Sequence, residues 1–149
     1  MSLPVKLKKL RRDARIPAYQ STSAAACDLC AALDAPLTLE PGERALIPTG
    51  LAMDFGASDG SVAALIFARS GLAVRQGLAL SNGVGVIDAD YRGEIKVAAV
   101  NLGKEPVTVR PGDRVAQMAF VPVLRASFEE ADEIGETERG EGGFGHTGV

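Results

Sequence analysis

The sequence has no tryptophan, a single histidine, two cysteines, five phenylalanines and two tyrosines among its 149 residues. With so few large rings, the core has to be built mainly from Val, Leu, Ile and Ala, which favours strands or the close packing of small residues. One histidine and two cysteines are also too few for a tetrahedral zinc site made of these ligands. The composition therefore predicts an aliphatic core and excludes a four-ligand site built from cysteine and histidine.

Long hydrophobic runs and an excess of positive charge are lacking as well. No apolar run approaches the ~18 residues of a membrane span, and the N-terminus lacks the apolar stretch of a signal peptide. We therefore expect a cytoplasmic protein with no membrane partner. The net charge of -3 argues against nucleic acid as a partner, because such binding needs a basic face. We interpret the basic residues near the N-terminus as a solvated strand edge: Lys6, Lys8, Lys9, Arg11, Arg12 and Arg15.

The two cysteines form a C-x-x-C at Cys27 and Cys30, which elsewhere indicates a redox pair or half of a zinc site. No second C-x-x-C is present, and the single histidine, His146, is far away in the sequence. Both cysteines lie in the run AACDLCAAL, which has the character of a strand. We predict that they are two small buried hydrophobic residues.

Seventeen glycines and eight prolines separate many short apolar runs. Short strands with turn residues between them are typical of an antiparallel sandwich or barrel. We expect tight turns at Pro41-Gly42 and Pro111-Gly112, each followed by a strand that contains an arginine. Only Ser70 to Gln76 has the character of a short helix. The prediction is an all-β domain over residues 1–128 with at most one short helix.

Residues 129–149 differ from the rest of the chain, with six glycines, seven acidic residues and no regular apolar period. We interpret this segment as a flexible C-terminal arm. Gly140, Gly142 and Gly145 match the spacing G-x-G-x-x-G, but a dinucleotide fingerprint must follow a strand and open a helix, and here the chain ends. Successive glycine amides beside Arg139 still suit an anion, so the arm is predicted to fold over a phosphate chain.

Five stretches, in order, carry a resemblance to a known family: AACDLCA, ARSGLA, NGVGVIDADYRGEI, PGDRVAQ and RGEGGFGHTG. From Pro17 to Gly148 the chain resembles the homotrimeric dUTP diphosphatases, the dUTPases. The resemblance implies a jelly-roll β-sandwich, a homotrimer whose active sites are shared between subunits, and Mg²⁺ as the cofactor. It implies hydrolysis of dUTP to dUMP and pyrophosphate, which lowers dUTP and supplies the dTTP precursor.

The resemblance gives Asp88 the role of activating the attacking water, which suits a carboxylate placed within hydrogen-bond reach of that water. Asp90, two residues on, would point to the other face if the stretch is extended, so it is the weaker candidate. The first-motif aspartate, Asp28, is implied to act near the metal through water. Its alternative interpretation is a buried turn carboxylate paired with an arginine.

The remaining roles concern the substrate. The resemblance places Arg69, Ser70, Gly71 and Gln117 at the phosphate chain, while Arg114 is interpreted as a buttress for the arm or a neighbouring subunit. A uracil-binding hairpin is implied around Asn82, Gly85, Val86 and Ile87, with Tyr91 stacked under the deoxyribose and Lys96 among the substrate contacts. The implied arm contacts are Arg139, Gly143, Phe144, Gly145, His146 and Thr147, with Phe144 as the lid over uracil.

The chain departs from the family pattern at Ala26 and Cys27, at Ala68, and at His146, where many members have serine. Two alternatives stay open at this stage. One is dCTP deaminase, which shares the fold but has an arginine and a catalytic glutamate where this chain has Val74 and Ala98. The other is a non-catalytic nucleotide-binding regulatory trimer, against which the intact Asp88 and the complete arm argue.

Overall fold

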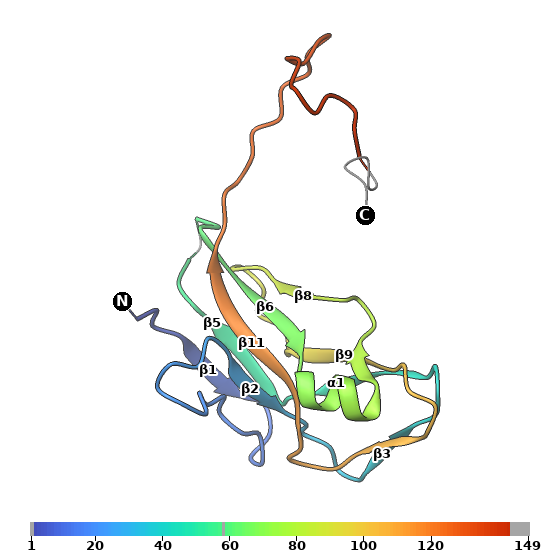
Figure 1. The fold of residues 1–149 in the computed structure, drawn as a ribbon. Coiled ribbons are helices and arrows are strands. Elements are labelled where there is room, and N and C mark those ends of the chain that lie inside the picture. The colour runs from blue at the N-terminus through green and yellow to red at the C-terminus, as the bar shows by residue number, and fades with distance from the viewer. Residues whose placement is uncertain (1, 58, 144–149) are drawn as a thin grey trace.

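The computed structural model describes residues 2–57 and 59–143. Within these residues it is made of short strands and one helix, which confirms the all-β prediction (Figure 1). The strands are β1 (Lys6–Lys9), β2 (Cys27–Cys30), β3 (Leu37–Leu39), β4 (Arg44–Pro48), β5 (Leu51–Asp54), β6 (Val62–Ala68), β7 (Leu78–Leu80), β8 (Gly85–Ile87), β9 (Lys96–Asn101), β10 (Val107–Val109) and β11 (Arg114–Pro122), and the helix is α1 (Ser70–Gln76).

The strands pair only in antiparallel fashion within the described residues. The largest sheet has the order β2-β11-β6-β8, and a second sheet has the order β4-β9-β7. Two further pairs, β1-β5 and β3-β10, complete the arrangement. Since β7 and β8 are neighbours in sequence but belong to different sheets, the segment between them crosses from one layer to the other.

The core lies between these sheets and is aliphatic, as the composition predicts. Ile66 and Met118 from the larger sheet and Ile47 and Val97 from the smaller one belong to a single buried cluster. Among the described residues, the aromatic side chains form one edge-to-face pair, Phe55 and Phe120, with ring centroids 5.4 Å apart. The two inner faces thus hold the sandwich together by aliphatic packing.

The expected turns and helix are confirmed. Gly42 and Gly112 have φ values of 81° and 83°, so each Pro-Gly pair supplies the left-handed residue that its turn requires. Arg44 and Arg114 begin the strands that follow. Helix α1 ends at Gly77, which has a φ of 75° and donates its backbone N–H to the carbonyl of Ala73.

The two cysteines lie on β2, three residues apart, so their side chains face opposite sides of the sheet. Cys27 is buried, and its Sγ lies 3.4 Å from the carbonyl oxygen of Met118. Cys30 is only half-buried, so the prediction of two buried hydrophobic residues is confirmed for Cys27 alone. Burial raises the pKa of both thiols.

Three of the six basic N-terminal residues lie at a strand edge, as predicted, and the three arginines follow that strand. Lys6, Lys8 and Lys9 are exposed on β1, which pairs with β5 on one side only. Arg11 is held by two carboxylates, Asp13 at 2.9 Å and Asp34 at 2.8 Å. A solvated edge with lysines resists pairing with another chain.

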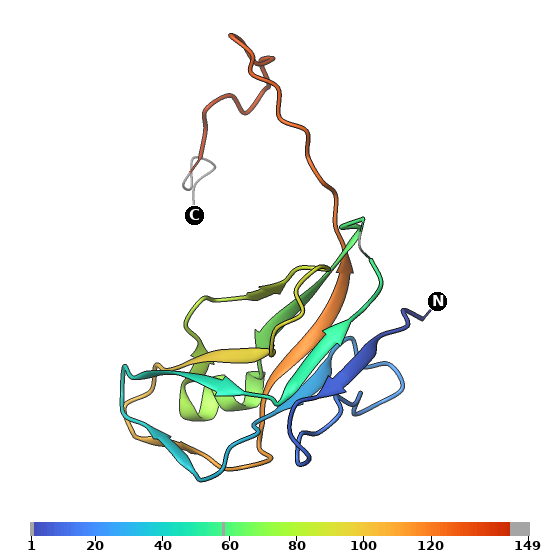
Figure 2. The same ribbon diagram turned by 180° about the vertical axis from the view of Figure 1, so that it is seen from behind.

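The chain leaves the sandwich at the end of β11. Among the residues that the structure describes, the last backbone hydrogen bond to the sandwich runs from Val123 N–H to the Ser61 carbonyl at 2.9 Å, and residues 124–141 are exposed. Figures 1 and 2 show this segment extending away from the sandwich, at the end of β11 opposite α1. The division into domain 1–128 and arm 129–149 stays a prediction. Among the described residues, no helix has the length and apolar character needed to cross a membrane.

Candidate active site

The most enclosed polar group of the larger sheet is the carboxylate of Asp28 on β2, whose side chain is 10% exposed. Arg69 Nε lies 3.0 Å from Oδ1, and Arg114 Nη1 lies 3.0 Å from Oδ2. Arg69 Nη1 also donates to the backbone carbonyl of Arg114 at 3.1 Å. Each carboxylate oxygen therefore has its own guanidinium partner. Of the two earlier interpretations, the paired carboxylate describes this geometry, although Asp28 lies in a strand and not in a turn.

A β-bulge explains how Arg114 and Gln117 reach the same side of the sheet. The register of β11 against β2 shifts between Arg114 and Ala116, which leaves Val115 as an extra residue. Without the bulge, side chains three positions apart would face opposite sides. With it, Gln117 lies opposite Asp28, and Arg114 bonds to the same carboxylate.

The start of α1 adjoins this group. Arg69 follows the last residue of β6, and its carbonyl accepts the N–H groups of both Leu72 and Ala73 at 3.0 Å. The N–H groups of Ser70 and Gly71 belong to the first helical turn and have no partner within the helix. Gln117 Nε2 donates to the Ala68 carbonyl at 3.0 Å, which ties β11 to the same strand end. We call Asp28, Arg69, Arg114 and Gln117 the arginine cluster.

The predicted base-binding segment lies at the other side of the sheet. Asn82 is in a tight turn, in which Gly83 N–H bonds to the Leu80 carbonyl at 3.1 Å and Val84 N–H to the Asn82 carbonyl at 2.8 Å. The strands on either side of this turn, β7 and β8, are not paired with each other among the described residues, so the uracil-binding hairpin is not a β7-β8 pair and stays a prediction.

Strand β8 is instead the edge of the larger sheet. It contains Gly85, Val86 and Ile87, and it bonds to β6 on one side only. A Cβ on Gly85 would lie 3.1 Å from the Cβ of Ile66, so a larger residue here would have to displace Ile66 by a few tenths of an ångström. The outer edge of β8 presents backbone N–H and C=O groups without a ladder partner among the described residues.

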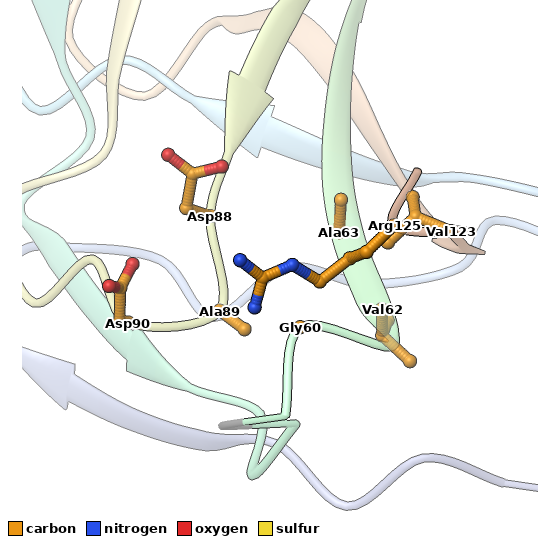
Figure 3. A pocket seen from close by; sticks show the side chains of 8 residues that line it. All are labelled: Gly60, Val62, Ala63, Asp88, Ala89, Asp90, Val123 and Arg125. Atoms are coloured by element: carbon orange, nitrogen blue, oxygen red, sulfur yellow. The ribbon is translucent and has the colours of Figure 1, made fainter. Parts of the chain in front are cut away.

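Asp88 follows β8 directly and starts a turn, because Tyr91 N–H bonds to the Asp88 carbonyl at 3.1 Å. We call residues 88–91 the aspartate turn. Asp88 and Asp90 are both exposed and line one pocket of about 380 Å³, shown in Figure 3. The condition under which Asp90 would face away from Asp88, an extended stretch, is not met, because the chain bends at Ala89.

The neighbouring predicted residues stabilise this turn. Tyr91 is 43% exposed, and its hydroxyl donates to the Glu94 carbonyl at 3.0 Å. A Cβ on Gly93 would lie 2.4 Å from that hydroxyl oxygen, so the ring rests on a glycine. Lys96, the first residue of β9, lies 3.7 Å from Glu94 in a half-exposed ion pair. The ring of Tyr91 is thus fixed at its hydroxyl end.

Within one chain, the arginine cluster and the aspartate turn lie at opposite ends of β6. Ile87 pairs with Ala64, so Asp88 comes level with Ala63, and Arg69 is six residues further along. At ~3.3 Å per strand residue this separation is ~20 Å. A single chain therefore does not bring Asp88 together with Arg69, Ser70, Gly71 and Gln117.

The arm is described only as far as Gly143, so only part of its predicted contribution to the site can be located. Arg139 Nε donates to the Gly142 carbonyl at 2.7 Å, and Gly140 has a φ of 51°, so a local turn forms around the predicted phosphate-binding glycines. Nothing lies within 4 Å of the position that a Cβ on Gly143 would take. The predicted contacts Phe144, Gly145, His146 and Thr147 lie outside the described residues.

Two functional features escape the sequence reasoning. One is the bulge at Val115, which nothing local in the sequence marks, because consecutive apolar residues also run from Met118 to Val121 in the same strand. The other is Arg125, whose side chain enters the pocket of Asp88 and Asp90 (Figure 3). Its position near the start of the arm carries no local signal.

Fold and site together define a class, an all-β protein that carries arginine, amide and carboxylate groups at the two ends of one sheet. The family model described as dUTPase matches residues 12–148. The chain therefore belongs to the dUTPase family, as the sequence resemblance indicated.

Individual relatives agree with this assignment. A deoxyuridine 5'-triphosphate nucleotidohydrolase of Desulfitobacterium hafniense (strain DSM 10664 / DCB-2) is 54% identical, over 99% of this chain and 98% of its own length. One of Paraburkholderia phymatum is 47% identical, over 99% of both chains. The dUTPase of Staphylococcus bacteriophage 80alpha, solved with dUpNHpp, is similar with a TM-score of 0.83 and 26% identity, over 98% of this chain and 99% of that one. The jelly-roll fold class is thereby confirmed.

Proposed function

We propose that this protein hydrolyses dUTP to dUMP and pyrophosphate. Water adds to the α-phosphorus. The bond from the α-phosphorus to the oxygen that bridges the α- and β-phosphates breaks, and that oxygen leaves with pyrophosphate. The observation that carries the proposal is the junction of β8 with the aspartate turn. The free backbone edge of β8 suits base recognition. The next residue along the chain, Asp88, has an exposed carboxylate that suits a general base.

Base selection follows from the free edge of β8. The edge of uracil presents acceptor, donor and acceptor groups, and cytosine reverses two of these. The backbone groups of Gly85, Val86 and Ile87 are fixed by pairing with β6, so a mismatched base leaves polar groups unpaired, which is costly. Asn82 lies in the turn that precedes this edge. We propose that Tyr91, fixed by Glu94 and Gly93, lies under the deoxyribose and excludes a ribose 2′-OH.

Phosphate binding is assigned to the arginine cluster and to the first turn of α1. Arg69 is already oriented by Asp28, so little side-chain entropy is lost when an anion arrives. The N–H groups of Ser70 and Gly71 and the side chain of Gln117 add neutral donors. Arg139, Gly143 and residues 144–147 of the arm are proposed to cover the phosphates and the base, and Lys96 to contribute a further charge.

The separation of the two groups along β6 supports a homotrimer with shared sites. Asp88 of one subunit would have to meet the arginine cluster of another, since the two lie ~20 Å apart in one chain. The exposed arm is long enough to reach a third subunit. A closed ring of three identical, heterologous contacts satisfies all of these requirements at once.

The residues described do not fit a direct Mg²⁺ site. No group of three His, Cys, Asp or Glu side chains among them is arranged to hold a metal ion. Asp28, the predicted metal contact, has a guanidinium on each oxygen. If Mg²⁺ is used, phosphate oxygens and water would hold it, with Asp28 acting through water. Magnesium dependence stays a proposal, as does the cytoplasmic location.

The alternatives have less support. Val74 is 86% exposed on α1 and Ala98 lies within β9, so these positions lack the charged groups that deamination requires. Purified protein incubated with Mg²⁺ and dUTP should release pyrophosphate and dUMP, with much lower kcat/KM for dTTP, dCTP and UTP. Release of ammonia from dCTP, or nucleotide binding without turnover, would contradict the proposal. A similar kcat/KM for UTP and dUTP would contradict the role of Tyr91.

A further inference from the structure

Arg125 lies where the chain leaves the sandwich. β11 ends with Pro122 opposite Val62, and the Val123 N–H bonds to the Ser61 carbonyl, so the backbone next to Arg125 is fixed. The side chain runs over Gly60, which has a φ of 74°. A Cβ there would lie 3.1 Å from Cδ and 3.6 Å from Nη1 of Arg125. The missing side chain of Gly60 thus leaves the space that Arg125 occupies.

The guanidinium of Arg125 extends toward the aspartate turn. Figure 3 shows it between Gly60 and the backbone of Asp88 and Ala89. Among the described residues that line this pocket, Arg125 is the one cation, and Asp88 and Asp90 are the two anions. In the described part of the chain, neither carboxylate has an ion-pair partner within 4.0 Å, so the Arg125 guanidinium acts on them from beyond that distance.

The other cations near this turn are already engaged. Arg92 donates to the Ala89 carbonyl at 2.7 Å and lies 3.1 Å from the carboxylate of Asp54. Lys96 pairs with Glu94 at 3.7 Å. Two carboxylates two residues apart repel each other, and a nearby positive charge relieves that repulsion. Arg125 is the group placed to supply it.

We propose that Arg125 is a positioning residue that balances the paired negative charges of Asp88 and Asp90 and thereby holds Asp88 in place for catalysis. The inference rests on the proposed function, in which Asp88 is the base. Arg125 acts through the aspartate turn and not on the substrate, so it should affect kcat more than KM. A charge-balancing role depends on the positive charge at this position and not on the planar shape of the guanidinium, so a lysine should also serve.

The kinetic test compares Arg125→Gln with Arg125→Lys. The Gln variant should lose kcat on the order of tenfold with KM changed less than about twofold, and the Lys variant should recover most of that loss. Arg12→Gln is the matched control, because Arg12 is exposed and does not line the pocket, and it should match the unmodified protein. Full activity of Arg125→Gln, a change confined to KM, or a Lys variant as slow as the Gln variant would each overturn the proposal.

A second test does not depend on what the protein hydrolyses. Thermal unfolding of the full chain is measured for Arg125→Gln, Asp90→Asn and the double variant. If Arg125 balances the two carboxylates, Asp90→Asn should raise the Tm in the Arg125→Gln background by more than it does in the unmodified protein. Additive Tm changes would overturn the inference. Absence of dUTP hydrolysis by the unmodified protein would instead overturn the proposed function. The Tm comparison of the single and double variants would then decide the role of Arg125.

Discussion

Arg69 Nε lies 3.0 Å from Oδ1 of Asp28, and this ion pair joins β2 to the start of α1. The first-motif aspartate and the second-motif arginine, more than forty positions apart in the chain, thus form one unit. Arg114, at the start of β11, bonds to the other oxygen of the same carboxylate. The three strands β2, β6 and β11 are therefore linked at one end by charge as well as by backbone pairing.

Asp28→Asn should be destabilising and should also reduce turnover. The carboxylate is nearly buried and serves two guanidinium groups, so its loss should cost about 3 kcal/mol of unfolding free energy. Arg69 would lose its orientation, so KM for dUTP should rise. Asp13→Asn is the matched control, because Asp13 pairs with Arg11 in an exposed bridge, and its Tm should barely change. Equal changes of the two variants in denaturant midpoint and in Tm would contradict this account.

Asp88→Asn should lower kcat by a factor on the order of 10² or more while nucleotide still binds. The side chain is exposed and the volume is unchanged, so the Tm should stay close to that of the unmodified protein. Asp90→Asn, which lines the same pocket, should cause a much smaller loss. If the Asp90 variant proved the slower of the two, the role of the base would move to Asp90.

Mixing two inactive variants should restore activity if the site is shared between subunits. Arg69→Gln and Asp88→Asn are each expected to be nearly inactive, and each is checked for folding by its Tm. After co-refolding in equal amounts, a site that takes its two residues from different subunits is intact in one half times one half of cases. Activity should then reach roughly one quarter of the unmodified value. No recovery would show that one chain supplies both residues.

Truncation after Glu138 should leave folding and oligomer mass unchanged and abolish most turnover. Residues 124–141 are exposed, and among the described residues the last backbone hydrogen bond to the sandwich is that of Val123, so the removed residues contribute little to stability. Thermal unfolding, light scattering and dUTP hydrolysis are measured on the same preparation. Turnover near the full-length rate would refute the role of the arm.

Gly77→Ala should be far more destabilising than Gly42→Ala. Both glycines have positive φ, 75° and 81°, so each substitution carries a backbone cost of about 1 kcal/mol. At Gly77 the new Cβ would also lie 2.2 Å from the backbone nitrogen of Gly103, whereas nothing lies within 4 Å at Gly42. The expected loss at Gly77 is several times larger. Comparable denaturation midpoints for the two variants would show that the clash is relieved by backbone movement.

The sequence alone determined the elements of this protein whose cause is local. Pro-Gly pairs specify their own left-handed turns, and Ser70 to Gln76 is bounded by Gly77, so both were predicted correctly. The family was also determined by the sequence, because five ordered motifs are a property of the chain. Arg125 and the bulge at Val115 were not, since neither has a local signal.

Only the tertiary structure decided where the predicted groups meet. Asp28, Arg69 and Gln117 come together because β11 pairs with β2 and β6 at once, and pairing partners distant in sequence are set by the packing of whole sheets. The same pairing holds Asp88 ~20 Å from them, because antiparallel register fixes position along a strand to within one residue. Local sequence specifies which side chains are available for chemistry, whereas the register of the sheet specifies the distances between them.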